Sequence, residues 1–326
     1  MIKAGLVGAG HLGKIHLKLL QQSKHYNLVG FHDADKENGR KIEAEFGYRY
    51  FENFEDLLDQ IEMLDIVTPT LYHYQYALKA IEKRIHFFIE KPVTQTLEQA
   101  KEILSLCNEH NIKAQVGHVE RFNPAFIATK QYIQDPMFIE IHRLAEFNPR
   151  GTDVSVVLDL MIHDLDILLS LVKSKVKEIH ASGVCVVSKT PDITNARIEF
   201  ENGCVANLTT SRISMKAMRK SRFFQRDAYI SVDFLEKKAE VIRMKEAPEN
   251  PSDFDMIIES AEGEKSQILF EYPTIEANNA ILDELNAFAR AIAKDDLVEV
   301  SLEDGTEALE VALKIMSLIQ KEPNSN

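Results

Sequence analysis

The stretch AGLVGAGHLG, residues 4–13, decides the fold of this chain. Its first half is an apolar run that predicts a buried strand. Gly8, Gly10 and Gly13 follow with the G-x-G-x-x-G spacing, and a helical apolar pattern begins directly afterwards. In this arrangement the first glycine permits a tight turn, the second lets a phosphate approach the backbone, and the third lets helix and strand pack closely. The stretch therefore predicts a dinucleotide bound at a helix N-terminus, where unpaired N–H groups face the phosphates.

An acidic residue extends this prediction to the choice of cofactor. Residues 28–31 predict a second strand, and Asp33 lies at its end, about twenty residues past the last glycine of the turn. A carboxylate there accepts hydrogen bonds from the adenosine ribose and repels a 2′-phosphate, so we expect NAD rather than NADP. The residues expected to hold the cofactor from these two segments are Gly8, Gly10, His11, Leu12, Gly13 and Asp33.

Strands and helices alternate through the rest of the first third of the chain. This alternation predicts an α/β Rossmann domain, a doubly wound parallel sheet covered on both faces, over residues 1–119. Helices are expected at residues 36–46, 54–58, 74–81 and 97–110, and strands at residues 64–67, 86–89 and 113–116.

The tripeptide Glu90-Lys91-Pro92 follows one of these strands, and Thr68-Pro69 follows another. Carboxyl ends of parallel strands meet at one edge of the sheet, where open α/β sheets bind their ligands. Pro92 also restricts the backbone of Lys91. A lysine before a proline, taken alone, is typical of a solvated loop. Its place after the glycine-rich turn instead predicts a lysine beside the cofactor.

The second half of the chain has a different pattern. Strand-like runs dominate from residue 176 to about residue 270, and Asn202-Gly203 predicts a type I′ hairpin between two of them. Such runs predict an antiparallel sheet. We expect residues 120–326 to form an α+β domain with a largely antiparallel open sheet. Its helices are expected over about a dozen residues from Pro124 and over residues 158–172, 279–293 and 303–319.

One of these predicted helices carries ionisable side chains in an apolar context. Asp159 and His163 are four residues apart and share a helix face, which Asp166 continues. A carboxylate beside a histidine orients the ring and makes it a better proton acceptor, as removal of a hydroxyl proton requires. Three alternatives stay open, namely a cap or salt-bridge face without chemistry, a buried structural histidine, and a metal site made by the three side chains.

Composition excludes several classes of protein. The net charge of −13 over 326 residues disfavours binding to nucleic acid, and no apolar run approaches the length of a membrane span. Cys107, Cys185 and Cys204 are scattered and contain no Cys-x-x-Cys pair. This favours a reducing compartment, the cytoplasm, and no cysteine-based metal site.

These motifs, in this order, resemble the glucose–fructose oxidoreductase/inositol dehydrogenase (Gfo/Idh/MocA) family. The resemblance implies hydride transfer between NAD(P) and a secondary alcohol of a sugar or cyclitol. It implies Lys91, Asp159 and His163 as the catalytic residues, which also contact the substrate. It adds further residues to the cofactor site, namely Thr68, Pro69, His73, Glu90 and Lys91. Glycines that often precede the aspartate in this family are replaced here by Val156 and Val157.

Residues 116–124 and 157–164 are similar to the branch of the family that contains UDP-N-acetylglucosamine 3-dehydrogenases. The implied substrate is a nucleotide sugar such as UDP-N-acetylglucosamine, oxidised at C3. Arg121, Asn123 and Arg150 are implied as further substrate-binding residues. Arginines that could bind a diphosphate by charge-assisted hydrogen bonds are Arg121, Arg143, Arg150 and Arg212.

Two other functions fit the same fold. One is a non-catalytic regulator that binds a dinucleotide or a sugar, and the other is a glycosidase that retains its NAD through the catalytic cycle. The family resemblance also implies a homodimer or homotetramer, because the open sheet often mediates assembly.

Overall fold

The computed structural model describes residues 1–148, 154–250, 252 and 255–320. The chain forms two compact units, described here one at a time. The first comprises Met1–Phe122 and Asn279–Glu310, and the second comprises Asn123–Asn278 and Val311–Asn326. The first unit thus contains residues 279–310, which we had expected in the second domain. The apolar side chains of this returning segment, among them Leu285 and Phe288, are buried in the core of the first unit.

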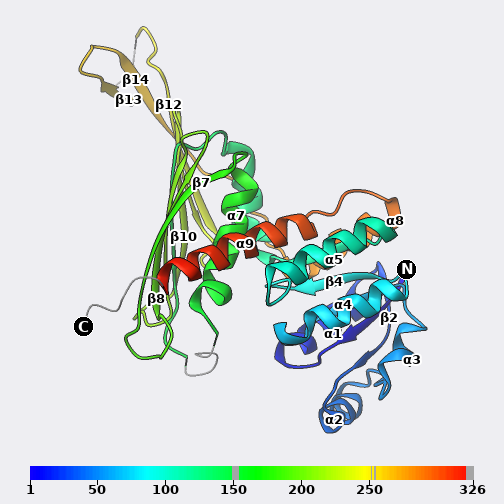
Figure 1. Ribbon diagram of the computed structural model, residues 1–326. Helices are drawn as coiled ribbons and strands as arrows, with labels where there is room; N and C mark the ends of the chain where they lie inside the picture. Colours follow the sequence, from blue (N-terminus) through cyan, green and yellow to red (C-terminus); the bar gives the residue numbers. More distant parts are fainter. Residues whose placement is uncertain (149–153, 251, 253–254, 321–326) are drawn as a thin grey trace. The chain divides into compact units, whose positions relative to one another are not determined.

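The first unit is built on a five-stranded sheet, and every strand pair in it is parallel (Figure 1). The strand order is β2-β1-β3-β4-β5, so the order reverses between β1 and β3. A single bridge joins Tyr50 to Phe31 on β2 and extends this edge by one residue pair. The strands are β1 Ile2–Val7, β2 Tyr26–His32, β3 Met63–Ile66, β4 His86–Glu90 and β5 Ala114–Gly117.

Helices cover both faces of this sheet. Residues of α1, α8 and the sheet form one buried cluster, which includes Ala4 and Leu6 of β1. Gly5 lies between those two residues, and a Cβ at this position would point to the other face and lie 2.9 Å from Leu57 of α3. The helices of this unit are α1 His11–Gln22, α2 Lys36–Phe46, α3 Phe54–Leu58, α4 His73–Glu82, α5 Leu97–His110 and α8 Ala280–Lys294, with short 3₁₀ turns at Thr70–Tyr72 and Val119–Phe122. Helix α9, Leu302–Ile319, begins in this unit, and its residues from Val311 onward belong to the second.

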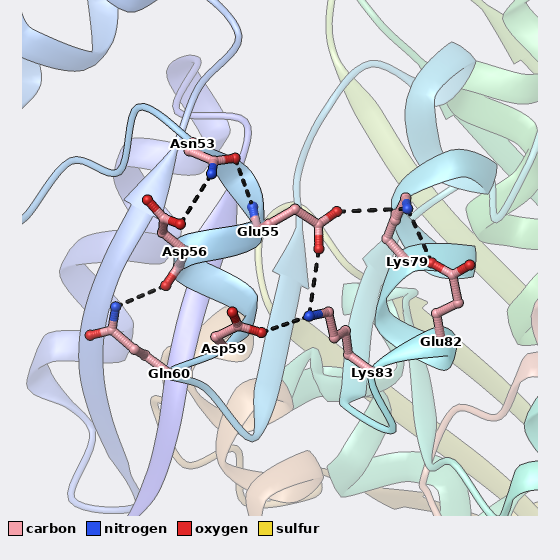
Figure 2. A network of polar contacts seen from close by, with 8 residues as sticks. All are labelled: Asn53, Glu55, Asp56, Asp59, Gln60, Lys79, Glu82 and Lys83. Carbon is pink, nitrogen blue, oxygen red and sulfur yellow. Dashed lines mark hydrogen bonds and ion pairs between the residues drawn. The ribbon is translucent and has the colours of Figure 1, made fainter.

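An exposed network of ion pairs joins α3 to α4 (Figure 2). Lys83 lies 2.6 Å from Asp59 and 3.7 Å from Glu55, and Lys79 lies 3.7 Å from Glu55. All of these side chains are more than a third exposed. Water and salt screen such pairs, so the network contributes little to stability.

The second unit contains a nine-stranded sheet (Figure 1). Its strand order is β13-β14-β12-β11-β10-β6-β9-β8-β7, and β6 and β9 form the one parallel pair among these strands. The largely antiparallel open sheet is confirmed. The strands are β6 Phe138–Leu144, β7 Val176–Val184, β8 Ile193–Phe200, β9 Val205–Ser211, β10 Met218–Phe224, β11 Ala228–Asp233, β12 Lys238–Glu246, β13 Met256–Glu259 and β14 Lys265–Glu271.

The connection between β8 and β9 differs from the predicted type I′ turn. Four residues separate the strands, and Gly203 has a φ of +88° whereas Asn202 has a negative φ. A type I′ turn needs a positive φ at both central residues, so this prediction is wrong in its turn type.

Two helices of the second unit also differ from expectation. The helix at Pro124 is short, with α6 spanning Pro124–Thr129 and a 3₁₀ turn at Lys130–Tyr132. The helix expected over residues 158–172 consists of a π-helical turn, Val157–Met161, followed by α7, Ile162–Leu171. Asp159 lies in the π-helical turn, a conformation that is rare and often found at functional sites. Among the described residues, no helix is both long and apolar enough to cross a membrane.

Candidate dinucleotide and catalytic site

The glycine-rich turn has the geometry that a bound pyrophosphate requires. Gly8 has a φ of +94°, and a side chain there would lie 2.8 Å from the backbone of Thr68. A Cβ at Gly13 would lie 2.0 Å from the Gly8 carbonyl oxygen, whereas a Cβ at Gly10 would meet no atom within 4 Å. Gly8 and Gly13 therefore close the turn, and Gly10 leaves open space in front of the backbone. Helix α1 begins there with no side-chain cap and no acidic residue in its first turn, so its N-terminus suits an anion.

A cavity of about 510 Å³ lies against this turn, within the first unit. Its size is in the range of small-molecule sites. Seven residues of the predicted cofactor site line it, namely Gly8, Gly10, His11, Leu12, Asp33, Thr68 and Pro69. Residues that we had not expected there include Tyr72, Gln75 and Tyr76. Their signal in the sequence is weak, because an amphipathic helix start after Thr68-Pro69 is also typical of ordinary core packing.

Asp33 is fixed at the rim of this cavity. Its Oδ2 atom accepts hydrogen bonds from the Ala9 backbone N–H, at 2.8 Å, and from the Asn38 amide, at 3.1 Å. Its Oδ1 atom accepts from the Asp35 backbone N–H at 2.8 Å. These bonds hold the carboxylate where the adenosine ribose of a bound dinucleotide would lie in this type of fold.

His73 has a different place from its neighbours Thr68 and Pro69. The side chain is buried and is not among the residues that line the cavity. Its Nε2 atom lies 2.8 Å from the Thr68 carbonyl oxygen, and its Nδ1 atom lies 3.0 Å from the Pro92 carbonyl oxygen. Burial lowers its pKa, and the backbone hydrogen bonds only partly offset this. His73 therefore connects the segment after β3, which carries Thr68, to the segment after β4, which carries Lys91 and Pro92. We call these segments the Thr68 loop and the Lys91 loop, and His73 can influence a bound cofactor through them.

Glu90 and Lys91 lie at the carboxyl end of β4. Since β1, β3 and β4 are neighbours, the segments that follow them emerge at one edge of the sheet. These segments carry Gly8, Thr68 and Lys91. The Glu90 carboxylate accepts a hydrogen bond from the Lys91 backbone N–H at 3.2 Å, and the Lys91–Pro92 peptide bond is cis. The structure thus brings the lysine to the edge at which the dinucleotide cavity opens.

Asp159, His163 and Asp166 differ strongly in exposure. Asp159 is exposed, His163 is half-buried, and Asp166 is only 1% exposed. Asp166 therefore belongs to the interior of the second unit and does not continue the accessible face of Asp159. Within the part of the chain that the structure describes, no group of three or more histidine, cysteine, aspartate or glutamate side chains is arranged to hold a metal ion.

The arginines proposed to bind a diphosphate are differently engaged. Arg143 forms a two-pronged ion pair with Asp164, with both N···O distances 2.8 Å. Arg212 donates to the Val154 carbonyl oxygen at 2.6 Å, and the largely buried Arg121 lies 3.6 Å from Asp304. Arg150 lies outside the described residues. Arg143 is therefore a structural cation and not a ready diphosphate ligand.

Asn123 is a helix cap, whereas the sequence led us to expect a substrate contact. Its Oδ1 atom accepts a hydrogen bond from the Ala125 N–H at 3.1 Å, at the start of α6. Its Nδ2 atom donates to the Phe234 carbonyl oxygen at 3.0 Å. Both ends of the buried amide are engaged within the second unit, which leaves it poorly suited to hold a ligand.

Comparison with known protein families agrees with this geometry. Residues 2–118 match the family described as "Oxidoreductase family, NAD-binding Rossmann fold", and residues 135–225 match the GFO/IDH/MocA C-terminal domain. The first match covers the sheet that carries the dinucleotide cavity. NAD is thus the cofactor of this family, and the open glycine turn described above fits it.

Individual relatives are dehydrogenases. The chain is 36% identical, over 72% of its length and 74% of the relative, to UDP-N-acetylglucosamine 3-dehydrogenase of Acidithiobacillus ferrooxidans. A solved structure of that enzyme has a TM-score of 0.88 at 30% identity and covers 98% of both chains. Scyllo-inositol dehydrogenase from Lactobacillus casei, solved with NAD(H) and scyllo-inositol, shares the fold with a TM-score of 0.78 at 22% identity over 98% of this chain and 97% of that one.

Two family domains in order and a relative above 30% identity over most of both chains leave one assignment. The chain belongs to the Gfo/Idh/MocA family of NAD-binding oxidoreductases.

Proposed function

We propose that this oxidoreductase transfers a hydride between NAD and a secondary alcohol of a nucleotide sugar, with oxidation of UDP-N-acetylglucosamine at C3 as the specific reaction. The position of Lys91 carries the proposal. Lys91 follows β4 at the edge of the sheet where the glycine turn follows β1 and Thr68 follows β3, and this supports a role for its amine beside the cofactor.

The proposed chemistry divides between Lys91 and the pair Asp159–His163. NAD, when bound, supplies the acceptor for the hydride that leaves the carbinol carbon. His163, oriented by Asp159, accepts the hydroxyl proton. Lys91 holds the same oxygen and stabilises the negative charge that develops on it. Lys91 is the alternative base, since the pKa of a desolvated lysine can fall toward neutrality.

The substrate class is supported by the relative from Acidithiobacillus ferrooxidans, which is named for UDP-N-acetylglucosamine. Other relatives are named for inositol and for glucose 6-phosphate, with identities of 24–32%. Arg121, which we propose as a substrate contact, would have to share its guanidinium with Asp304. Arg143 is left out of the proposed substrate site, because its Nε and Nη2 atoms already donate to the buried Asp164 carboxylate.

Turnover with matched substrates tests this function. The enzyme is mixed with NAD and either UDP-N-acetylglucosamine, scyllo-inositol or glucose 6-phosphate, and NADH is followed by absorbance. We expect NADH and a 3-oxo sugar nucleotide from UDP-N-acetylglucosamine alone. NADH from inositol or glucose 6-phosphate alone would refute the nucleotide-sugar substrate. Hydrolysis of the sugar nucleotide without net NADH, or binding without turnover, would refute the dehydrogenase reaction.

A homodimer or homotetramer remains our proposal for the assembly. Exposed apolar side chains lie on β12, β13 and β14, and they support it. They include Met244, Met256, Ile258 and Phe270. Light scattering during gel filtration measures the mass of the assembly, and a monomer at micromolar concentration would contradict the proposal. The three free cysteines support a reducing compartment, the cytoplasm.

A further inference from the structure

Three ionisable side chains meet in the interior of the first unit, directly behind the Lys91 loop. His16 comes from α1, Asp65 from β3 and Glu90 from the end of β4. The His16 Nδ1 atom lies 2.9 Å from Asp65 Oδ2, and its Nε2 atom lies 3.5 Å from Glu90 Oε1. The side chains are 1%, 0% and 13% exposed, in that order. None of the three lines the dinucleotide cavity, so they form a separate feature.

The surrounding backbone leaves room for this group. Gly117 of β5 pairs with Glu90, and a Cβ at Gly117 would lie 2.8 Å from Glu90 Oε1. Any larger residue at this position would displace the carboxylate. The His16 ring lies with its centroid 5.8 Å from that of Phe88, which fixes it from the side of β4. The glycine turn places His16 in the second turn of α1, where it reaches both strands.

The geometry requires one shared proton. A neutral imidazole has a single N–H donor, yet both nitrogens of His16 face carboxylate oxygens. The group is satisfied when His16 is an imidazolium, or when Glu90 carries the proton and donates it to Nε2. Burial lowers the pKa of His16, but Asp65, through its charge and hydrogen bond, and the charge of Glu90 raise it above the ordinary value. Burial raises the pKa of Glu90 against the opposing charges of His16 and Lys91. Because the pKa values of His16 and Glu90 are both raised, the pair tends to keep one proton, on either His16 or Glu90.

We propose that His16 and Asp65 are positioning residues for Lys91, which share a proton with Glu90 and thereby set the charge that Glu90 presents to the lysine amine. A fully ionised Glu90 would hold Lys91 as an ammonium ion. A Glu90 whose charge His16 partly neutralises lets Lys91 gain and lose a proton more easily. The inference rests on the catalytic role proposed for Lys91 and deepens it.

Tyr26 is a further ionisable group near the three, and it leaves this balance unchanged. Burial and the Asp65 charge raise the pKa of Tyr26, on β2, well above 10, although Arg290 of α8 opposes this. Tyr26 is therefore neutral at working pH. His118, buried after β5, follows Gly117 along the chain. We therefore assign the charge next to Lys91 to His16, Asp65 and Glu90.

The test measures the protonation of Lys91 directly, without catalysis. The pH dependence of Lys91 labelling by trace acetic anhydride, followed by peptide mass spectrometry, gives its pKa in the full-length protein. His16→Asn removes the cation next to Glu90, and we expect the pKa of Lys91 to rise by about one unit. Glu90→Gln removes the anion, and we expect the pKa of Lys91 to fall. In the Glu90→Gln background the effect of His16→Asn should shrink, since His16 acts through Glu90.

Tyr26→Phe is the matched control, because it removes a buried hydrogen bond to the Leu285 carbonyl oxygen in the same unit. It should leave the pKa of Lys91 at the wild-type value. An unchanged pKa in His16→Asn, in protein that still binds NAD, would overturn the inference. So would equal shifts in His16→Asn and Tyr26→Phe, which would indicate a general loss of packing. The pKa of Lys91 could also shift as expected in an enzyme that oxidises none of the three substrates. That result would refute the proposed reaction and support the positioning role.

Discussion

Each unit of this protein buries a small group of charges, and the two groups are built differently. In the first unit, His16 lies between Asp65 and Glu90 with one near contact and one longer one, 2.9 and 3.5 Å. In the second, Arg143 and Asp164 meet at 2.8 Å through two parallel hydrogen bonds, with side chains 4% and 5% exposed. The first group contains a histidine, and against the opposing effect of burial its pKa is raised by the charges of Asp65 and Glu90. The second contains an arginine, which stays charged at any working pH.

The His16–Asp65–Glu90 group can therefore change its protonation with pH, and we call it the responsive group. The Arg143–Asp164 pair keeps its charges, and we call it the fixed pair. A histidine between two carboxylates can exchange a proton with them with little movement of the heavy atoms. The negative charge on Glu90, next to Lys91, can therefore change. A two-pronged arginine–carboxylate pair satisfies both partners and anchors α7 to β6, on the helix that carries His163. Arg143, one of the four arginines predicted as candidates to bind a diphosphate, thus has a structural role. His16, to which the sequence assigned no role, is instead placed to influence the charge next to Lys91.

The largest effect should come from the residues next to the two groups, Lys91 and His163. We expect Lys91→Ala and His163→Ala each to lower kcat by at least about a hundredfold, because a charge-stabilising or proton-accepting group is lost. Both variants should still bind NAD, which calorimetry measures. The variant that also loses the pH dependence of kcat identifies the base. Near-normal turnover of either variant would remove it from the proposed mechanism.

Removal of one partner from the fixed pair should cost stability. Arg143→Ala leaves Asp164 buried without its cation, and we expect a loss of about 3–5 kcal/mol in the free energy of unfolding. Urea unfolding followed by circular dichroism measures it. The double variant Arg143→Met/Asp164→Leu should recover most of this loss. A small effect of Arg143→Ala would mean that the pair is not the fixed anchor described here.

Asp33 is a third kind of charged residue, a carboxylate that lines the dinucleotide cavity and is expected to set the choice of cofactor. Asp33→Asn keeps an acceptor for the Ala9 N–H but removes the charge that repels a 2′-phosphate. We expect the ratio of kcat/KM for NADP to that for NAD to rise roughly tenfold, or about 1.4 kcal/mol. Steady-state kinetics with both cofactors checks this. A ratio equal to that of the wild type would show that Asp33 does not set cofactor choice.

The responsive group should also make stability depend on pH. The pKa of His16 is raised from 6.5, so the folded protein holds this proton more tightly than the unfolded chain. The resulting stabilisation is complete below pH 6.5 and is lost as the pH rises through the folded-state value. The pKa of Glu90 is raised from 4.5, so its proton also stabilises the folded protein at low pH, and this stabilisation is also lost as the pH rises through the folded-state value.

Urea midpoints of wild type and His16→Asn should therefore converge as the pH rises above 6.5. The control is Tyr26→Phe, which removes a buried hydroxyl of the same unit whose pKa is raised well above 10, so no group that titrates over this pH range is gained or lost. Its difference from the wild type should stay constant over the same range. Parallel curves for His16→Asn would contradict the raised pKa.

The smallest effect should come from the exposed charges of Figure 2, whose side chains are all more than a third accessible to solvent. Lys83→Ala removes the contacts with Asp59 and Glu55, which water and salt already screen. We expect no measurable change in the urea midpoint at physiological salt. A loss as large as that of Arg143→Ala would show that burial is not what distinguishes the two kinds of charge.

Much of the candidate site could be predicted from local sequence. The glycine spacing, Asp33 and Thr68-Pro69 line the cavity as expected, since each is tied to the end of a strand that its own residues specify. The helix at 158–172 was less predictable, because an apolar run has the same composition whether it begins as a π-helix or an α-helix. The capping role of Asn123 was hard to predict for a related reason. A buried amide that caps a helix cannot be distinguished, in sequence, from one that binds a ligand.

By itself, the sequence determined the parallel sheet, the glycine turn and the strand ends at which Lys91 and Thr68 emerge. These depend on periodicity and turn residues within short segments. Only the tertiary structure decided that residues 279–310 complete the first unit, that Arg143 pairs with Asp164, and that His16 meets Asp65 and Glu90. His16 and Asp65 are 49 positions apart in the chain. Their meeting depends on how a helix packs on two strands, and no local pattern records that packing.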